Sequence, residues 1–129
     1  MNKTKSVKQS FDLTGKVAVI TGGIGLLGKK HAEAIAEFGG IPILLDIDEK
    51  AGTKKARKIS NQYQVDCEFM LCDITDESQI SSVRDSLLSK FGHIDILINN
   101  AAIDPKINED SEINLSRLEN FPIDQWNLE

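Results

Sequence analysis

Short apolar runs alternate with longer amphipathic stretches over residues 16–98. Runs rich in Val, Ile and Leu are typical of strands that are buried on both faces. These runs predict strands at Lys16–Thr21, Ile41–Leu45, Asp66–Leu71 and Ile94–Ile98. The amphipathic stretches between them have helical spacing, and they predict helices at Leu26–Phe38, Glu49–Ser60 and Asp76–Phe91.

The apolar positions of two helices predict which of their faces are buried. The stripe of the first helix consists of Leu27, Ala34, Ile35 and Phe38. The stripe of the last helix consists of Ile80, Val83, Leu87 and Phe91. Asp76 and Gln79 have the spacing of a capping box, and Gly39 stands where the first helix is expected to stop.

Strands that alternate with helices of this length indicate right-handed crossovers and a parallel sheet, the α/β class. From about Asp104 the pattern fades, because residues 104–120 are polar and carry no strong period. A further helix is expected to begin within Ile123–Leu128.

Length and composition limit the class of protein. The 129 residues suffice for one domain, and 40% hydrophobic and 27% charged residues are ordinary for a globular chain. No run approaches the roughly 20 apolar residues of a membrane span. The N-terminal residues do not resemble a secretory signal, which makes the cytoplasm the expected location.

Charge and cysteine placement exclude several partners. The net charge is −5, with three Lys in residues 1–10 and seven acids against two bases in residues 104–129. This distribution predicts a disordered basic tail at 1–10 and no nucleic-acid footprint. Cys67 and Cys72 lie five positions apart, on opposite faces of a strand, which predicts unpaired thiols and no metal site.

The glycine loop Thr21–Gly28 carries the strongest motif. It contains G-x-G-x-x-G at Gly23, Gly25 and Gly28, between a predicted strand and a predicted helix. In such a loop the first glycine allows a tight turn, the second lets the backbone approach a pyrophosphate, and the third allows close packing. The N–H groups at Leu26–Gly28 are then expected to hold the phosphates.

In dinucleotide-binding proteins, the glycine motif is accompanied by an acid at the end of the next strand. Asp46 stands 18 residues after Gly28, where a carboxylate accepts hydrogen bonds from the ribose hydroxyls and repels a 2′-phosphate. Neither position 45 nor position 47 is Lys or Arg, so we expect NAD rather than NADP. Asp48 is a weaker candidate for the same role.

With these residues the chain resembles the short-chain dehydrogenase/reductase family. Two further markers support the resemblance: Asp73 in Cys72-Asp73-Ile74-Thr75, and Asn99-Asn100-Ala101-Ala102 after the last strand. The resemblance covers residues 14–102 and implies a truncated Rossmann-type sheet with the order 3-2-1-4, with Asp73 meeting the adenine. The expected cofactor-binding residues are Thr21, Gly22, Gly23, Gly25, Leu26, Leu27, Gly28, Asp46, Asp73, Ile74, Asn99, Asn100 and Ala101.

The motifs also depart from the commonest family pattern. Ala102 replaces a usual glycine, and Thr21-Gly22-x-x-Gly25-x-x-Gly28 is the spacing of the extended branch of nucleotide-sugar epimerases and dehydratases. Short segments, Asn99–Lys106 and Asn120-Phe121-Pro122, resemble oxidoreductases of flagellin glycan modification. The resemblance therefore implies chemistry on an alcohol or ketone, with a sugar or nucleotide sugar as a candidate substrate.

The family's catalytic Ser, Tyr and Lys have no counterpart in this chain. Tyr63 is the single tyrosine, and Cys67 stands where a Lys would follow it. His31 and His93 are expected to be structural. Residues 11–129 thus read as a partial dinucleotide-binding domain without activity of its own.

Two interpretations remain open for this partial domain: part of an NAD-dependent oxidoreductase, and a non-catalytic dinucleotide-binding module. A Ser and a Tyr-x-x-x-Lys after Glu129 would favour the first, and a natural stop would favour the second. We expect a homo-oligomer, because Ile94–Ile98 would form an open sheet edge.

Overall fold

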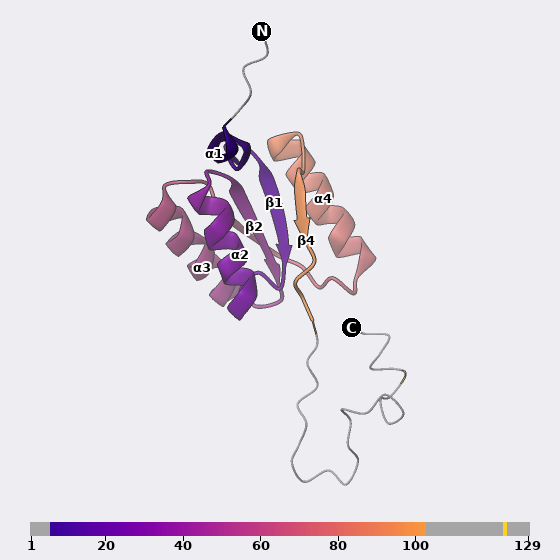
Figure 1. Cartoon of the computed structure of the whole chain (residues 1–129). Helices are drawn as coiled ribbons and strands as arrows, with labels where there is room; N and C mark the ends of the chain where they lie inside the picture. Colours follow the sequence, from indigo (N-terminus) through magenta and orange to yellow (C-terminus); the bar gives the residue numbers. More distant parts are fainter. Residues whose placement is uncertain (1–5, 103–122, 124–129) are drawn as a thin grey trace.

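The computed structural model describes residues 6–102 and residue 123. Four parallel strands form one sheet, β1 (Val17–Thr21), β2 (Ile41–Asp46), β3 (Glu68–Leu71) and β4 (Ile96–Ile98). Their order is β3-β2-β1-β4, which confirms the predicted Rossmann-type α/β fold (Figure 1). Val19 of β1 pairs with Ile43 on one side and with Leu97 on the other.

Helices cover both faces of this sheet (Figure 1). They are α2 (Leu26–Glu37), α3 (Glu49–Tyr63) and α4 (Glu77–Phe91), and a short α1 (Val7–Ser10) precedes β1. Helices α2 and α3 pack on one face through small residues such as Ala32 and Ala56, against Ile20 and Leu44 of the central strands. Helix α4 packs on the other face through Val83 and Leu87.

The central strands are buried on both faces, as their continuous apolar runs predict. In β1, Val17 and Val19 belong to the core under α4, while Ile20 belongs to the core under α2 and α3. This alternation is the two-residue period of a strand. The two cores fix the register, so the carboxyl ends of β1 and β2 lie at one edge of the sheet.

The predicted face of the first helix is wrong for three of its four residues. Leu27 and Phe38 are 63% and 48% exposed, and Ala34 is also exposed. The buried face consists of Gly28, Ala32, Ile35 and Ala36. Small residues let the helix backbone lie close to the sheet. The larger side chains of Leu27 and Phe38 therefore lie outside the helix–sheet interface, exposed to solvent. In α4, Val83 and Leu87 are buried as predicted and Phe91 packs against them, whereas Ile80 is 44% exposed.

Capping residues set the helix boundaries. The Asp76 side chain accepts hydrogen bonds from the backbone of Ser78 and Gln79, so α4 begins at Glu77. The predicted reciprocal capping box is not formed, because the Gln79 side-chain oxygen accepts from the Asp73 N–H at 2.9 Å and the Asp76 N–H donates to the Asp73 carbonyl at 3.0 Å. After α2, Gly39 adopts a positive φ of 83°, as expected for a helix stop.

Several element ends differ from their predicted positions. Helix α3 runs on to Tyr63, and β3 and β4 begin later, at Glu68 and Ile96. In the N-terminal segment, Ser6 and Gln9 form a capping box around the short helix Val7–Ser10. Residues 1–5, the polar stretch 104–120 and all of Ile123–Leu128 except Ile123 lie outside the described residues.

The two cysteines lie on opposite faces of the sheet, as their spacing predicts. Cys67 packs with the core under α2 and α3, and Cys72 belongs to the core under α4. Both are unpaired, and burial raises the pKa of Cys67 to about 12 and that of Cys72 above its ordinary value. In the part of the chain that the structure describes, no helix has the length and apolar character needed to cross a membrane.

Candidate cofactor-binding site

A cleft of about 770 Å³ lies at the carboxyl ends of the strands. Its walls come from four segments that are distant in sequence: the glycine loop, the end of β2, and the segments that follow β3 and β4. Open parallel sheets bind ligands at this edge. Nine of the predicted site residues border the cleft: Gly22, Gly25, Leu26, Leu27, Asp46, Asp73, Ile74, Asn100 and Ala101.

The other four predicted residues do not border the cleft. Thr21, Gly23 and Gly28 are buried behind its wall, and Asn99 is exposed at the end of β4. A Cβ at Gly23 would lie 2.8 Å from Leu44 Cβ, and one at Gly28 would lie 2.2 Å from the Gly22 carbonyl oxygen. Gly23 and Gly28 therefore allow the close packing of the glycine loop on β2 and on itself.

The tight turn of the loop centres on Gly22 rather than on Gly23, which corrects the predicted role. Gly22 has a φ of +61°, and a Cβ there would lie 3.0 Å from Ala101 Cα. Only glycine adopts this conformation without steric cost. The Gly25 N–H donates to the Gly22 carbonyl over 3.1 Å and closes the turn.

Helix α2 presents an uncapped N-terminus to the cleft. Its N-cap residue, Gly25, has no side chain to accept a hydrogen bond, and the side chains of Leu26 and Leu27 are largely exposed. The N–H groups of a helix's first turn lack intrahelical acceptors and lie at the positive end of its dipole. The uncapped first turn of α2 fits a phosphate group, because no side chain occupies the space before it and its hydrogen-bond donors are backbone N–H groups.

Asp46 stands at the end of β2, beside the glycine loop. One carboxylate oxygen accepts from the Ile47 N–H at 2.8 Å, and the other accepts from the Ile24 N–H at 3.4 Å. The other candidate, Asp48, accepts from the Ala51 N–H at 2.9 Å and caps α3. Asp46 borders the cleft and Asp48 does not, so of the two candidates only Asp46 is placed to contact a ligand in the cleft.

Thr21 and Asn100 join the glycine loop to the end of β4. The Thr21 hydroxyl accepts from the N–H groups of Asn100 and Ala101, each at 3.0 Å. The Asn100 side-chain amide donates to the carbonyls of Thr21 at 3.0 Å and of Gly22 at 3.2 Å. These hydrogen bonds let the buried Thr21 hold Asn100 at the border of the cleft.

Asp73 and Ile74 form the far wall. One Asp73 oxygen accepts from the hydroxyl and the N–H of Thr75, at 2.7 and 2.9 Å. These hydrogen bonds hold the pKa of Asp73 below its ordinary value, so its carboxylate is charged at neutral pH. Ile74 is 41% exposed and adds an apolar surface beside that charge. Such a pair could contact a nucleobase, with the apolar side chain against the ring face and the carboxylate at its polar edge.

Other titratable candidates lie away from the cleft. Tyr63 ends α3 and packs in the core under α2 and α3, and His93 contacts the Gly15 carbonyl and Asp95 before β4. Neither of them borders the cleft, nor does His31. Among the described residues, no group of His, Cys, Asp or Glu could hold a metal ion.

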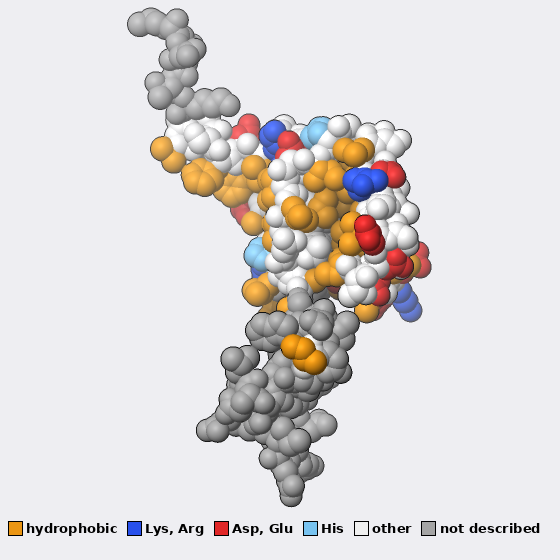
Figure 2. All heavy atoms as spheres, turned by 90° about the vertical axis from the view of Figure 1, so that its right-hand side faces the viewer, with side chains coloured by type: hydrophobic (Ala, Val, Ile, Leu, Met, Phe, Trp, Pro, Cys, Tyr) orange, Lys and Arg blue, Asp and Glu red, His pale blue; other side chains and the backbone are white. Residues whose placement is uncertain are grey.

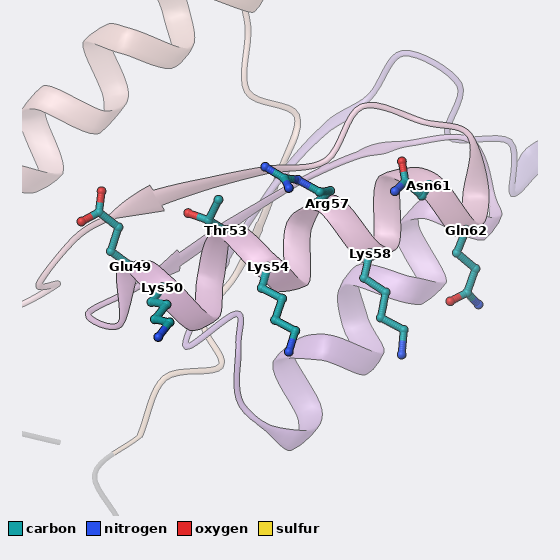
Figure 3. Close-up of a pocket in the computed structure, with 8 residues that line it drawn as sticks. All are labelled: Glu49, Lys50, Thr53, Lys54, Arg57, Lys58, Asn61 and Gln62. Carbon is teal, nitrogen blue, oxygen red and sulfur yellow. The ribbon is translucent and has the colours of Figure 1, made fainter.

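A second, shallow hollow runs along the outer face of α3 (Figure 3). Its lining is mostly charged and exposed side chains from this one helix, and it shares no residue with the cleft. A single solvated helix face brings no groups together from different elements, so we assign it no site.

Sequence reasoning missed one contact of the glycine loop. The Lys55 ammonium of α3 donates to the Ile24 carbonyl at 2.7 Å, across 31 positions of sequence. Nothing in the sequence distinguishes Lys55 from the other basic residues of α3, since only the fold places it against the loop.

Comparison with known proteins agrees with this geometry. The family model described as short chain dehydrogenase matches residues 16–123. A short chain dehydrogenase/reductase of Colletotrichum higginsianum is 32% identical over 117 residues, which are 91% of this chain and 43% of the relative. The chain therefore spans less than half the length of this relative.

Two solved structures share the fold and have comparable identity. An NAD+-bound xylitol dehydrogenase is 34% identical with a TM-score of 0.67, over 70% of this chain and 35% of the other. An NADPH-dependent 3-quinuclidinone reductase from Rhodotorula rubra is 28% identical with a TM-score of 0.72, over 93% and 44%. With its parallel sheet, its glycine loop and a family model that covers most of its length, the chain belongs to the short-chain dehydrogenase family.

Proposed function

We propose that this chain is the cofactor-binding part of an NAD-dependent oxidoreductase that acts on an alcohol or a ketone. One observation carries the proposal: the uncapped first turn of α2 and the Asp46 carboxylate border the same cleft. Phosphate donors and a ribose acceptor are the two groups that recognise an unphosphorylated dinucleotide.

The adenosine diphosphate part of the dinucleotide would have counterparts in the cleft. The N–H groups of Leu26 and Leu27 would hold the pyrophosphate, and Asp46 would accept hydrogen bonds from the adenosine ribose. Ile74 and Asp73 would flank the adenine. A bound nicotinamide supplies hydride transfer, while this chain's residues bind and orient the cofactor.

We also propose a substrate class. A sugar or sugar alcohol is consistent with the xylitol dehydrogenase among the structural neighbours. The narrower resemblance to flagellin glycan modification stays a prediction, as do the cytoplasmic location and the homo-oligomer. A non-catalytic dinucleotide-binding module remains the alternative, and a Ser and a Tyr-x-x-x-Lys in the gene's continuation would argue against it.

The spacing of Gly22, Gly25 and Gly28 favours a second candidate, a nucleotide-sugar epimerase or dehydratase. Such enzymes would use the same cofactor cleft, so the two candidates differ in substrate and not in dinucleotide binding. Activity of the whole protein on a nucleotide sugar without net change of NAD would favour this candidate.

A Gly25→Asp variant tests dinucleotide binding separately from folding. Gly25 has a φ of −64° and a ψ of 178°, a conformation that Asp adopts readily, and Asp is a favourable N-cap residue. The variant should keep or raise the unfolding temperature, while its carboxylate occupies the phosphate position. We expect calorimetric titration with NADH to show binding to the wild-type chain and none to Gly25→Asp. Equal binding by both would contradict the proposed site.

A further inference from the structure

One lysine of α3 differs from its neighbours on that helix. Lys50, Lys54 and Lys58 are exposed, and Figure 3 shows them extending from the outer face of α3. Lys55 is half-buried, and its ammonium donates a hydrogen bond of 2.7 Å to the Ile24 carbonyl of the glycine loop. This contact is a charge-assisted hydrogen bond between two elements, which is stronger than one between neutral groups.

The peptide groups around Ile24 are held on several sides. The Ile24 N–H donates to Asp46 at 3.4 Å, and its carbonyl accepts from Lys55. The next N–H, of Gly25, donates to the Gly22 carbonyl at 3.1 Å. Both polar ends of the Ile24–Gly25 peptide are thus fixed, directly before the N-terminus of α2.

The direction of the Ile24 carbonyl matters for an anionic ligand. Ile24 borders the cleft, whereas Lys55 does not. The hydrogen bond therefore directs the Ile24 carbonyl oxygen towards Lys55 of α3, which does not border the cleft. In this orientation the carbonyl would not compete with the first-turn N–H groups of α2 for a phosphate. A carbonyl that turned into the cleft would repel a pyrophosphate.

We propose that Lys55 is a positioning residue of the cofactor site, which orients the Ile24–Gly25 peptide for pyrophosphate binding. This inference rests on the proposed dinucleotide function. It makes Lys55 act through the loop backbone and not by contact with the cofactor. Loss of the ammonium should therefore weaken ligands that carry a pyrophosphate, and leave unchanged those that carry only the nucleoside.

The test compares three variants of the full chain. Lys55→Met keeps the aliphatic stem and removes the donor, and Lys55→Arg keeps a donor. Lys54→Met removes the same charge from an exposed neighbour and serves as the matched control. Calorimetry measures ADP-ribose binding, NMR titration measures the weaker binding of adenosine, and thermal unfolding monitors stability.

We expect Lys55→Met to lose about tenfold in affinity for ADP-ribose, the equivalent of roughly 1.4 kcal/mol. Its adenosine affinity should match that of Lys54→Met, while its unfolding temperature should be modestly lower, because the Ile24 carbonyl loses a part-buried hydrogen bond. Lys55→Arg should recover part of the ADP-ribose affinity. If Lys55→Arg recovers ADP-ribose affinity, the loss in Lys55→Met is due to the missing hydrogen-bond donor and not to the changed shape of the side chain.

Four results would overturn the inference. Equal ADP-ribose affinity in Lys55→Met and Lys54→Met would show that the contact has no effect. A parallel loss for adenosine, with a lower unfolding temperature, would mean a purely structural role. In calorimetric titrations of Lys55→Met with NADPH and NADH, a lower affinity for NADPH alone would mean that Lys55 contacts a 2′-phosphate directly. If wild-type chain does not bind ADP-ribose, the proposed function fails, and this inference fails with it.

Discussion

The hydroxyl of Thr21 accepts hydrogen bonds from two successive backbone N–H groups, those of Asn100 and Ala101, each at 3.0 Å. The side chain of Asn100 returns two hydrogen bonds to the carbonyls of Thr21 and Gly22. These contacts tie β1 and the glycine loop to the segment after β4. They fix the position of Asn100 and Ala101, which border the cleft.

A Thr21→Val substitution should destabilise the chain by about 1–3 kcal/mol, because it leaves half-buried N–H groups without their acceptor. Thr21→Ser retains the hydroxyl and loses one methyl group, so it should cost about 1 kcal/mol or less. Urea denaturation of the three proteins measures these differences. Equal stability of the Val and Ser variants would show that the hydroxyl contributes nothing.

The sequence predicts this sheet well because apolar runs report burial directly. The strands and the edge that carries the glycine loop follow from the runs that contain Val19, Ile43 and Leu97, and the family resemblance adds the strand order. The face of α2 is mispredicted because hydrophobicity favours Leu27 over Gly28, whereas close packing on the sheet favours the residue without a side chain.

Site residues that belong to a sequence motif can be predicted from the sequence. Contacts between side chains and loops that only the fold brings together cannot. Asp46 follows from its place at the end of a predicted strand. The contact between Lys55 and Ile24 is invisible to such reasoning, because it depends on how α3 lies against the loop. The sequence already favours Asp46 over Asp48, and the structure adds the capping role of Asp48.

We expect the chain to bind NADH more tightly than NADPH, because the Asp46 carboxylate would repel a 2′-phosphate. Asp46→Ala should lose about 2 kcal/mol of NADH binding, a typical loss for a hydrogen bond to a charged group, and should discriminate less between the two cofactors. Asp48→Asn keeps a capping side chain and should bind as the wild type does. Tighter NADPH than NADH binding in the wild-type chain would contradict this account.

The stability that Asp76 contributes should depend on pH. The Ser78 hydroxyl, and next the Gln79 side chain, lower the pKa of Asp76 below its ordinary 3.8. A carboxyl whose pKa is lower in the folded state stabilises the fold above its unfolded-state pKa, and this contribution is lost as the pH falls through the folded-state pKa. The difference in unfolding temperature between wild type and Asp76→Ala should therefore be largest near neutral pH and shrink below about pH 4. A difference that is constant from pH 7 to pH 2.5 would exclude this role.

The 129-residue chain should show no dehydrogenase turnover, even with NAD present. Tyr63 lies at the far end of α3 from the cleft, and the residue four positions after it is Cys67 rather than a lysine. Absorbance of NADH at saturating NAD with a panel of alcohols measures this, with mass spectrometry to exclude a longer protein. Steady NADH production by pure chain would overturn the prediction.

We also expect the chain to self-associate through β4. Among the described residues β4 pairs with β1 alone, and Leu97 and Ile94 are 60% and 37% exposed. Figure 2 shows hydrophobic side chains gathered on this side of the molecule. Exposed apolar edge strands tend to pair with other chains, and a lysine on the edge blocks such pairing. Sedimentation at tens of micromolar should show larger species for wild type than for Leu97→Lys, and a stable wild-type monomer would refute the expectation.

An NMR titration of the isotope-labelled chain with NADH tests the central claim most directly. The account predicts saturable shifts at the amides of Gly25, Leu26 and Leu27, accompanied by shifts at Asp46 and Ile74. The outer face of α3, at Lys54 and Lys58, should remain unchanged. Shifts confined to α3, or no saturable shifts in the glycine loop at millimolar NADH, would contradict the claim that the cleft at the end of β1 and β2 holds the cofactor.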